Sequence, residues 1–421
     1  MAARKRPPLT FREIAILGSV IVGAVAVIGG LLAADIRLGG LIGGGGEFLS
    51  IWAGARAFVW GQQPPYSAEV AGLAQQLAYG RVANPGENPY RLTVPFFLLP
   101  FFFPFALSSS AAVGRGIWLC LCQAAVAGSA SVTVALTEWR APRAFLLLLG
   151  AATVFGLYSA AAMFSGTPAI VLGLLYPTIL WAFQTERDEL AGALLVFTCF
   201  MWEVGALFLI LILWRVFYER RWAVIAGLAM TLVILLVSSF LLYPGWMLPF
   251  LVATVGQIRS GYGAAAGPVF HQIWPEHGTQ IAQAVAVLLS GLFIYEWWSA
   301  RHGDFRRFVW VCLLALSVMP LLGLRTDLGH MVVLGPSVVW ICAASFQRAR
   351  MGAGLALTAA VAVFVLPWLL VGRLLWLDDR AVYNYLFLFY PLFSIAGLYW
   401  TRWWFLRPNR TWLDEVRALR T

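Results

Sequence analysis

Apolar stretches of about twenty residues recur along almost the whole chain, and this length is what a helix needs to cross the hydrocarbon core of a bilayer. Of the 421 residues, 61% are hydrophobic and only 11% are charged, whereas about a quarter of a soluble domain is charged. The pattern predicts an all-α polytopic membrane protein that forms a single transmembrane domain over residues 1–421. The stretches lie near residues 12–35, 113–137, 143–163, 166–185, 222–244, 279–299, 307–323, 328–346, 353–376 and 383–403.

Residues 190–218 are too long for one span and are interrupted at Trp202-Glu203. We expect two short antiparallel helices with Glu203 at the turn, which brings the total to about twelve. An even number places both termini on one side. Most of the 29 Lys and Arg residues then fall in or beside segments on the side of the termini. The positive-inside rule makes that side cytoplasmic, with a cytoplasmic tail at 404–421, in a multi-pass protein of the plasma membrane. The scattered basic residues do not indicate nucleic-acid binding.

Two long segments are then external, about 36–112 and 245–278. Within the first, helical spacing from Phe48 to Trp60 predicts an amphipathic helix, and Ser67 can cap a second one. We expect both to lie along the membrane surface. The segment 94–108 is apolar, but three prolines would break a spanning helix, so it is predicted to be re-entrant or interfacial.

Glu47 follows four glycines and precedes the first amphipathic helix. A carboxylate in this position can take a proton from a substrate hydroxyl, because glycines allow close approach of a ligand and apolar neighbours tune its acidity. The alternative is a solvated loop acid.

Arg325, Asp327 and His330 lie between two spans, and Glu203 lies at a helix break. Arg325 and His330 could hold a phosphate, or Arg325 could pair with Asp327 to anchor the turn. Glu203 could face a cavity or make a structural hydrogen bond.

His271, Arg91 and Arg56 are weaker candidates for contact with an acceptor or an anionic headgroup, since such residues often only close a loop or snorkel. The sequence predicts no metal site, no cofactor and no nucleotide-binding loop.

The order of these pieces resembles the GT-C superfamily of membrane glycosyltransferases, and most closely glycosyltransferase family 87, the polyprenyl-phosphate-mannose-dependent mannosyltransferases. The resemblance is carried by an acid after the first helix, W-x-x-A-R, G-x-x-P-Y, a proline-rich aromatic segment, a split helix pair and a late Pro…His turn. In this chain these are Glu47, Trp52 with Ala55-Arg56, Gly61 to Tyr66, Pro89-Tyr90 through Pro104, residues 190–218, and Pro320 to His330.

The resemblance implies an inverting glycosyltransferase that moves a hexose, mannose in most relatives, from a polyprenyl-phosphate donor to a glycolipid or glycan acceptor at the external face. Glu47, where the family has an aspartate, would be the base. His330, Arg325, Arg56, Tyr66, Tyr90, Arg91, Glu203 and His271 would bind the donor phosphate or substrate.

Two other classes remain open. A catalytically silent subunit of a membrane complex is compatible with the glutamate at 47 and with Trp202-Glu203, where many relatives have a lysine. A lipid or solute transporter would need polar groups at mid-span and two pseudo-symmetric halves, and such polar groups are scarce here, with Glu203 as the exception.

Overall fold

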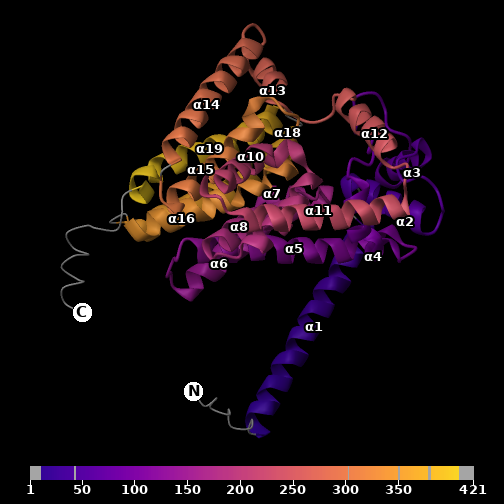
Figure 1. The fold of residues 1–421 in the computed structure, drawn as a ribbon, viewed down its shortest axis with the longest axis horizontal. Coiled ribbons are helices and arrows are strands. Elements are labelled where there is room, and N and C mark those ends of the chain that lie inside the picture. Colours follow the sequence, from indigo (N-terminus) through magenta and orange to yellow (C-terminus); the bar gives the residue numbers. More distant parts are fainter. Residues whose placement is uncertain (1–10, 42–43, 302, 349–350, 378–380, 407–421) are drawn as a thin grey trace.

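The computed structural model describes residues 11–41, 44–301, 303–348, 351–377 and 381–406. Every regular element in these ranges is a helix, as the sequence predicts (Figure 1). Seven helical segments are long and apolar enough to cross a membrane, or up to nine if each of two bent pairs counts as one span. The seven are Ala111–Leu136 (α5), Trp222–Leu242 (α11), Gly278–Ala300 (α14), Phe305–Leu322 (α15 and η3), Leu328–Gln347 (in η4 and α16), Gly352–Arg373 (in α17 and α18) and Val382–Trp403 (in α19).

The two bent pairs explain part of the difference from about twelve predicted spans. Helix α1 (Phe11–Leu41) bends by 97° into α2 (Gly46–Val59), and α6 (Arg143–Phe155) bends by 45° into α7 (Leu157–Ser165). Helix α8 (Ala169–Gln184) has only 16 residues. The number twelve therefore stays a prediction.

Helix α1 leaves the body of the molecule at an angle and meets it near α5 (Figure 1). Glycines allow the close contact: a Cβ on Gly116 would lie 2.5 Å from the Cα of Ile36, and one on Gly39 would lie 3.0 Å from the carbonyl of Ala112. Small residues are the usual means by which membrane helices approach one another. The contact fixes the end of α1 from which the chain turns into α2.

The segment after α1 forms the predicted short helices. Ser67 caps α3 (Ala68–Tyr79) by accepting a hydrogen bond from the Val70 amide, as the sequence predicts. Residues 94–108 form only η1 (Phe96–Phe102) and α4 (Phe103–Ala106), so no spanning helix occurs there. Helix α2 is more deeply covered than a surface helix would be, because nine of its residues, from Gly46 to Ala55, are buried. Phe48 stacks on Trp118 of α5, with ring centroids 5.8 Å apart.

The region 190–218 is broken where the sequence predicts. It forms α9 (Asp188–Leu195), η2 (Val196–Phe200) and α10 (Trp202–Glu219), with Met201 in an extended conformation between them. The start of α9 and the end of α10 line one cleft, so the chain runs out and back. Glu203 consequently lies at the far end from this cleft.

Helix α11 (Trp222–Leu242) runs from one end of the bundle to the other. It begins next to Arg221 and ends next to Tyr243, whose ring packs on Phe58 and Phe96. Its 21 residues span about 30 Å. We call the two regions the Arg221 end, which contains residues 183–188, 215–221 and 304–306, and the Glu47 end, which contains residues 44–108, 165–168, 243–278 and 323–330.

The Glu47 end is closed by α12 (Met247–Arg259) and α13 (Ala266–Ile273). Ala264 and Thr326 exchange two backbone hydrogen bonds of 2.8 Å, which join the second long segment to the turn before His330. The Gln257 side chain donates to Asn88 over 2.8 Å, and this bond joins the second long segment to the first. The two predicted external segments thus form one assembly.

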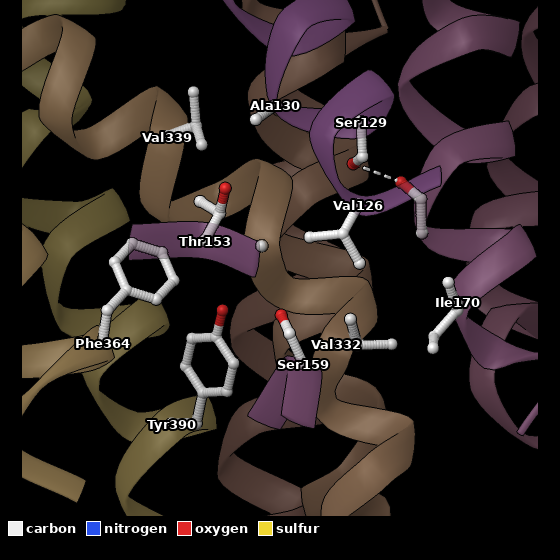
Figure 2. Close-up of a pocket in the computed structure, with 12 residues that line it drawn as sticks. Val126, Ser129, Ala130, Thr153, Ser159, Ile170, Val332, Val339, Phe364 and Tyr390 are labelled. Atoms are coloured by element: carbon white, nitrogen blue, oxygen red, sulfur yellow. Dashed lines mark hydrogen bonds between the residues drawn. The ribbon is translucent and has the colours of Figure 1, made fainter. Parts of the chain in front are cut away.

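The interior between α5, α7, α8, η4, α16 and α19 contains a cavity of about 20 Å³ (Figure 2). The hydroxyl of Ser129 donates to the carbonyl of Gly173 at its edge. A volume of this size accepts about one water molecule and no larger solute. The polar chemistry of the molecule is found at the ends of the bundle.

Candidate functional site

The Glu47 end brings Glu47 and His330 into direct contact, although 283 residues separate them in the chain. Nε2 of His330 lies 3.2 Å from Oε1 and 3.4 Å from Oε2 of Glu47. Both side chains are largely buried, with 11% of His330 and 20% of Glu47 exposed. The contact therefore forms a largely buried polar centre that keeps a small exposed surface.

Glycines place Glu47 at this position. Gly45 precedes α2 with a φ of 77°, a left-handed conformation that glycine adopts without strain. Gly46 lies under the ring of Tyr90, and a Cβ there would be 2.0 Å from the ring. Glu47 then occupies the first turn of α2, where the free amides and the helix dipole stabilise a negative charge.

The hydrogen bonds around His330 determine its tautomer. The Asp327 amide donates to Nδ1 of His330 over 3.2 Å, so this nitrogen must carry a lone pair. Nε2 then carries the proton and donates it to Glu47. This arrangement is a capping box at the start of η4 (Leu328–Leu334), in which Asp327 is the N-cap residue. His330 is therefore oriented by the backbone and cannot accept a substrate proton at Nδ1.

Asp327 is held in turn by two donors. Its Oδ1 accepts from the Leu328 amide over 2.7 Å and from the Tyr383 hydroxyl over 2.6 Å. Arg325 and Asp327 make no ion pair with each other in the described part of the chain. The alternative of a structural Arg325–Asp327 pair is thus wrong, because Asp327 caps η4 instead.

The turn between α7 and α8 packs against the start of α2, next to Glu47. Gly166 has a φ of 72°, and a Cβ on it would lie 2.4 Å from Cβ of Phe48. The hydroxyl of the adjacent Thr167 is a further hydrogen-bonding group beside the Glu47 carboxylate. Thr167 is fully buried. A larger residue at position 166 would push α2, and with it Glu47, out of place.

Three tyrosines lie near this centre. The rings of Tyr79 and Tyr90 are 5.2 Å apart, and Tyr262 interacts electrostatically with Tyr79, Asp327 and Glu47. Burial raises the pKa of both Tyr90 and Tyr262; the next cause is a hydrogen bond with Tyr79 for Tyr90 and the Asp327 carboxylate for Tyr262. Both hydroxyls therefore stay protonated at neutral pH, and that of Tyr90 is engaged with Tyr79.

Glu203 also reaches the centre from the first turn of α10. It acts electrostatically on both His330 and Glu47, while the neighbouring Trp202 is half exposed. The residues named for the centre thus include two acids and no arginine or lysine.

Arg91 and Arg325 lie at the rim of the Glu47 end. The guanidinium of Arg91 packs against Gly256 of α12, and that of Arg325 packs against Gly261 just beyond it. Both side chains are exposed. Neither side chain touches Glu47 in this structure, and their contact with an anionic group stays a prediction.

Three other predicted site residues are not shown in contact with Glu47. Arg56 and Tyr66 make hydrogen bonds to backbone carbonyls, and His271 lies in α13. Arg56 donates to the carbonyls of Ala106 and Ser108, over 3.2 and 3.0 Å, and so holds the end of α4. The Tyr66 hydroxyl donates to the Val94 carbonyl. His271 is exposed in the last turn of α13. The structure therefore assembles Glu47, His330, Glu203 and Tyr90, and gives Arg56 and Tyr66 structural hydrogen bonds.

Several residues near this centre were not predicted from the sequence, namely Tyr79, Tyr262 and Tyr383, together with the capping role of Asp327. The spacing Asp-x-x-His is the signal that was available, because it matches the positions of an N-cap and its partner three residues later. The tyrosines carry no such signal, since they come from separate segments.

Among the described residues, no group of three or more His, Cys, Asp or Glu is arranged to hold a metal ion. Comparison of the chain with family models, with curated proteins and with solved structures gives no match. The site itself offers one carboxylate with free lone pairs, an imidazole that orients it, and tyrosine hydroxyls around them.

Proposed function

We propose that this chain is an inverting glycosyltransferase of GT-C type that moves a hexose, mannose by resemblance, from a polyprenyl-phosphate donor to a glycolipid or glycan acceptor. The observation that carries the proposal is the contact between Glu47 and the Nε2–H of His330. It unites the two most specific pieces of the sequence resemblance in one centre. A plasma-membrane location, about twelve spans and an external active site belong to the same proposal.

The reaction is a single displacement. Glu47 takes the proton of the acceptor hydroxyl, whose oxygen forms a bond to the anomeric carbon as the bond from that carbon to the phosphate oxygen breaks. The polyprenyl phosphate leaves with the electron pair. A phosphate leaving group needs cations rather than a protonating acid, so one essential carboxylate suffices, unlike the two that glycoside hydrolysis requires.

Glu47, and not His330, is assigned as the base because Nδ1 of His330 is occupied by the Asp327 amide and Nε2 carries the proton. His330 orients the carboxylate and leaves lone pairs of both Glu47 oxygens for the acceptor. Tyr90 and Tyr262 supply donors and ring faces that suit a hexose.

Transfer of radiolabelled sugar tests the proposal. Purified full-length protein is incubated with polyprenyl-phosphate-mannose or polyprenyl-phosphate-glucose and total membrane lipid. We expect transfer by the wild type and a loss of about 100-fold or more in Glu47→Gln, because general base catalysis contributes roughly 10² to 10⁴. Glu276→Gln is the matched control, since Glu276 is an exposed acid of the second predicted external segment.

Transfer that is equal in wild type and Glu47→Gln would contradict the assignment of the base. A second function, a catalytically silent subunit, is favoured by one observation, the carboxylate of Glu203 beside Glu47 where many relatives have a lysine. It predicts no transfer from either donor. It also predicts that a partner protein co-purifies equally with the wild type and Glu47→Gln.

A further inference from the structure

Helix α12 presents an apolar face that the rest of the described chain leaves uncovered. Six of its 13 residues are large, hydrophobic and 44–70% exposed. They recur at spacings of one, three and four residues, so they share one side of the helix. Figure 1 shows α12 towards the same end of the molecule as α2 and α3. The residues are Met247, Leu248, Leu251, Val252, Val255 and Ile258.

The same helix is fastened to the Glu47 end on its other side. Gln257 donates to Asn88 and accepts from the Arg91 amide. Beyond the helix, Ala264 pairs with Thr326, three residues before Gly329 and four before His330. These bonds hold the end of α12 in the same assembly as Glu47 and His330.

Three arginines gather where α12 ends. Arg259 is in its last turn, Arg91 packs on Gly256, and Arg325 packs on Gly261. All three are exposed, and none of them forms an ion pair within the described part of the chain. Residues 256–261 cover less than two helical turns, about 8 Å. Two of the guanidinium groups lie against residues of this stretch and the third belongs to Arg259 within it, and arginine binds phosphate through paired hydrogen bonds.

An apolar face that ends in three unpaired arginines is complementary to a molecule with a long hydrocarbon chain and one anionic head. We propose that α12, with Arg91, Arg259 and Arg325, is the docking site of the donor lipid. The isoprenoid chain lies along Leu248, Val252 and Val255, and its phosphate is held by the arginines. This inference rests on the proposed function, because that function makes the amphiphile a polyprenyl phosphate.

Photolabelling tests the site without any transfer reaction. The probe is a polyprenyl monophosphate that carries a photoreactive group in its chain and no sugar, added to the full chain in phosphatidylcholine nanodiscs. We expect label within residues 247–259 and a loss of about tenfold in Arg91→Gln and in Arg325→Gln, the size expected for one charge-assisted contact. Arg140→Gln, an exposed arginine between α5 and α6, should label like the wild type.

Two further variants separate docking from misfolding. Leu248→Ser with Val252→Ser should reduce labelling while the charges are intact, whereas Val287→Ser with Leu288→Ser, on an equally exposed face of α14, should not. Label spread evenly over lipid-facing helices, or equal labelling by a polyprenol that lacks phosphate, would overturn the proposal. So would equal competition by phosphatidylglycerol, since the site would then be a general one for anionic lipid.

The outcomes also distinguish this inference from the proposed function. Arginine-dependent label on α12, together with transfer that does not need Glu47, leaves the docking site standing and removes the assigned base. Transfer that needs Glu47, together with label on other helices, supports the assigned base and removes the docking site on α12.

Discussion

The two ends of the helix bundle differ in how three of their arginines are engaged, although each end also has paired arginines, such as Arg81 with Glu87 at the Glu47 end. At the Arg221 end, Arg221 pairs with Asp188, Arg215 pairs with Glu219 over 2.5 Å, and Arg306 lies 3.6 Å from Glu138. At the Glu47 end, Arg91, Arg259 and Arg325 have no carboxylate partner among the described residues, while Glu47 is paired with His330.

The difference indicates where a ligand is required. Paired arginines at the Arg221 end line a cleft of about 800 Å³ together with four carboxylates, as expected of residues that anchor helix ends at the membrane surface. Unpaired arginines on a rigid frame keep their hydrogen-bonding capacity for another molecule. Variants at the two ends should therefore separate activity from stability.

The largest effect after loss of Glu47 itself is expected from His330→Gln. The amide cannot accept from Asp327 and donate to Glu47 in the same geometry, so the carboxylate loses its orientation. We expect transfer to fall by about 100-fold, the cost of misplacing a catalytic group by roughly 1 Å. Initial rates at saturating donor measure it, with His277→Gln, an exposed histidine, as the control. Unchanged rates would show that His330 does not position Glu47.

Gly46→Ala tests the contact between the first turn of α2 and Tyr90. The new methyl group would lie 2.0 Å from the ring, so either the ring or the helix turn must move. We expect a loss of transfer of about tenfold or more and destabilisation of about 1–3 kcal/mol, the usual cost of overpacking. Gly72→Ala, in open space on α3, is the matched control. A stable and fully active Gly46→Ala would contradict this packing.

Arg221→Gln should lower stability and leave transfer unchanged. It removes hydrogen bonds to Asp188 and to the Phe183 carbonyl, and the packing of the guanidinium on the Phe183 ring. We expect destabilisation of about 1–3 kcal/mol, measured by thermal unfolding, because each bond to a charged group contributes in this range. Transfer per folded molecule should not change. A loss of specific activity would mean that the Arg221 end takes part in the reaction.

The smallest effect is expected from Glu87→Gln in the exposed turn after α3. Hydrogen bonds from Arg81 and from the Asn84 amide lower the pKa of Glu87 from 4.5 to about 2. Because the pKa is lowered in the folded state, the stabilisation is present above pH 4.5 and is lost as the pH falls towards 2. A small difference in melting temperature at pH 7 should vanish by pH 2. A difference that persists there would contradict the ionised pairing.

Much of the helical layout could be predicted because it depends on local sequence. The apolar stretches, the Ser67 cap, the break at Met201 and the absence of a long helix in 94–108 all follow from residues within one or two turns. The number of spans could not be predicted as well, since bends at Gly156 and after Leu41 depend on what packs beside each helix.

The candidate site shows the same division. The sequence by itself identified Glu47 and His330 as separate candidates, each from its neighbours: glycines before one, a turn between spans around the other. Only the tertiary structure decided that they touch, that the Asp327 amide selects the tautomer of His330, and that Arg91 and Arg325 reach the end of α12. These contacts join residues up to 283 positions apart. No local pattern encodes them, because they arise from the packing of helices whose order in space is set by their combined apolar faces.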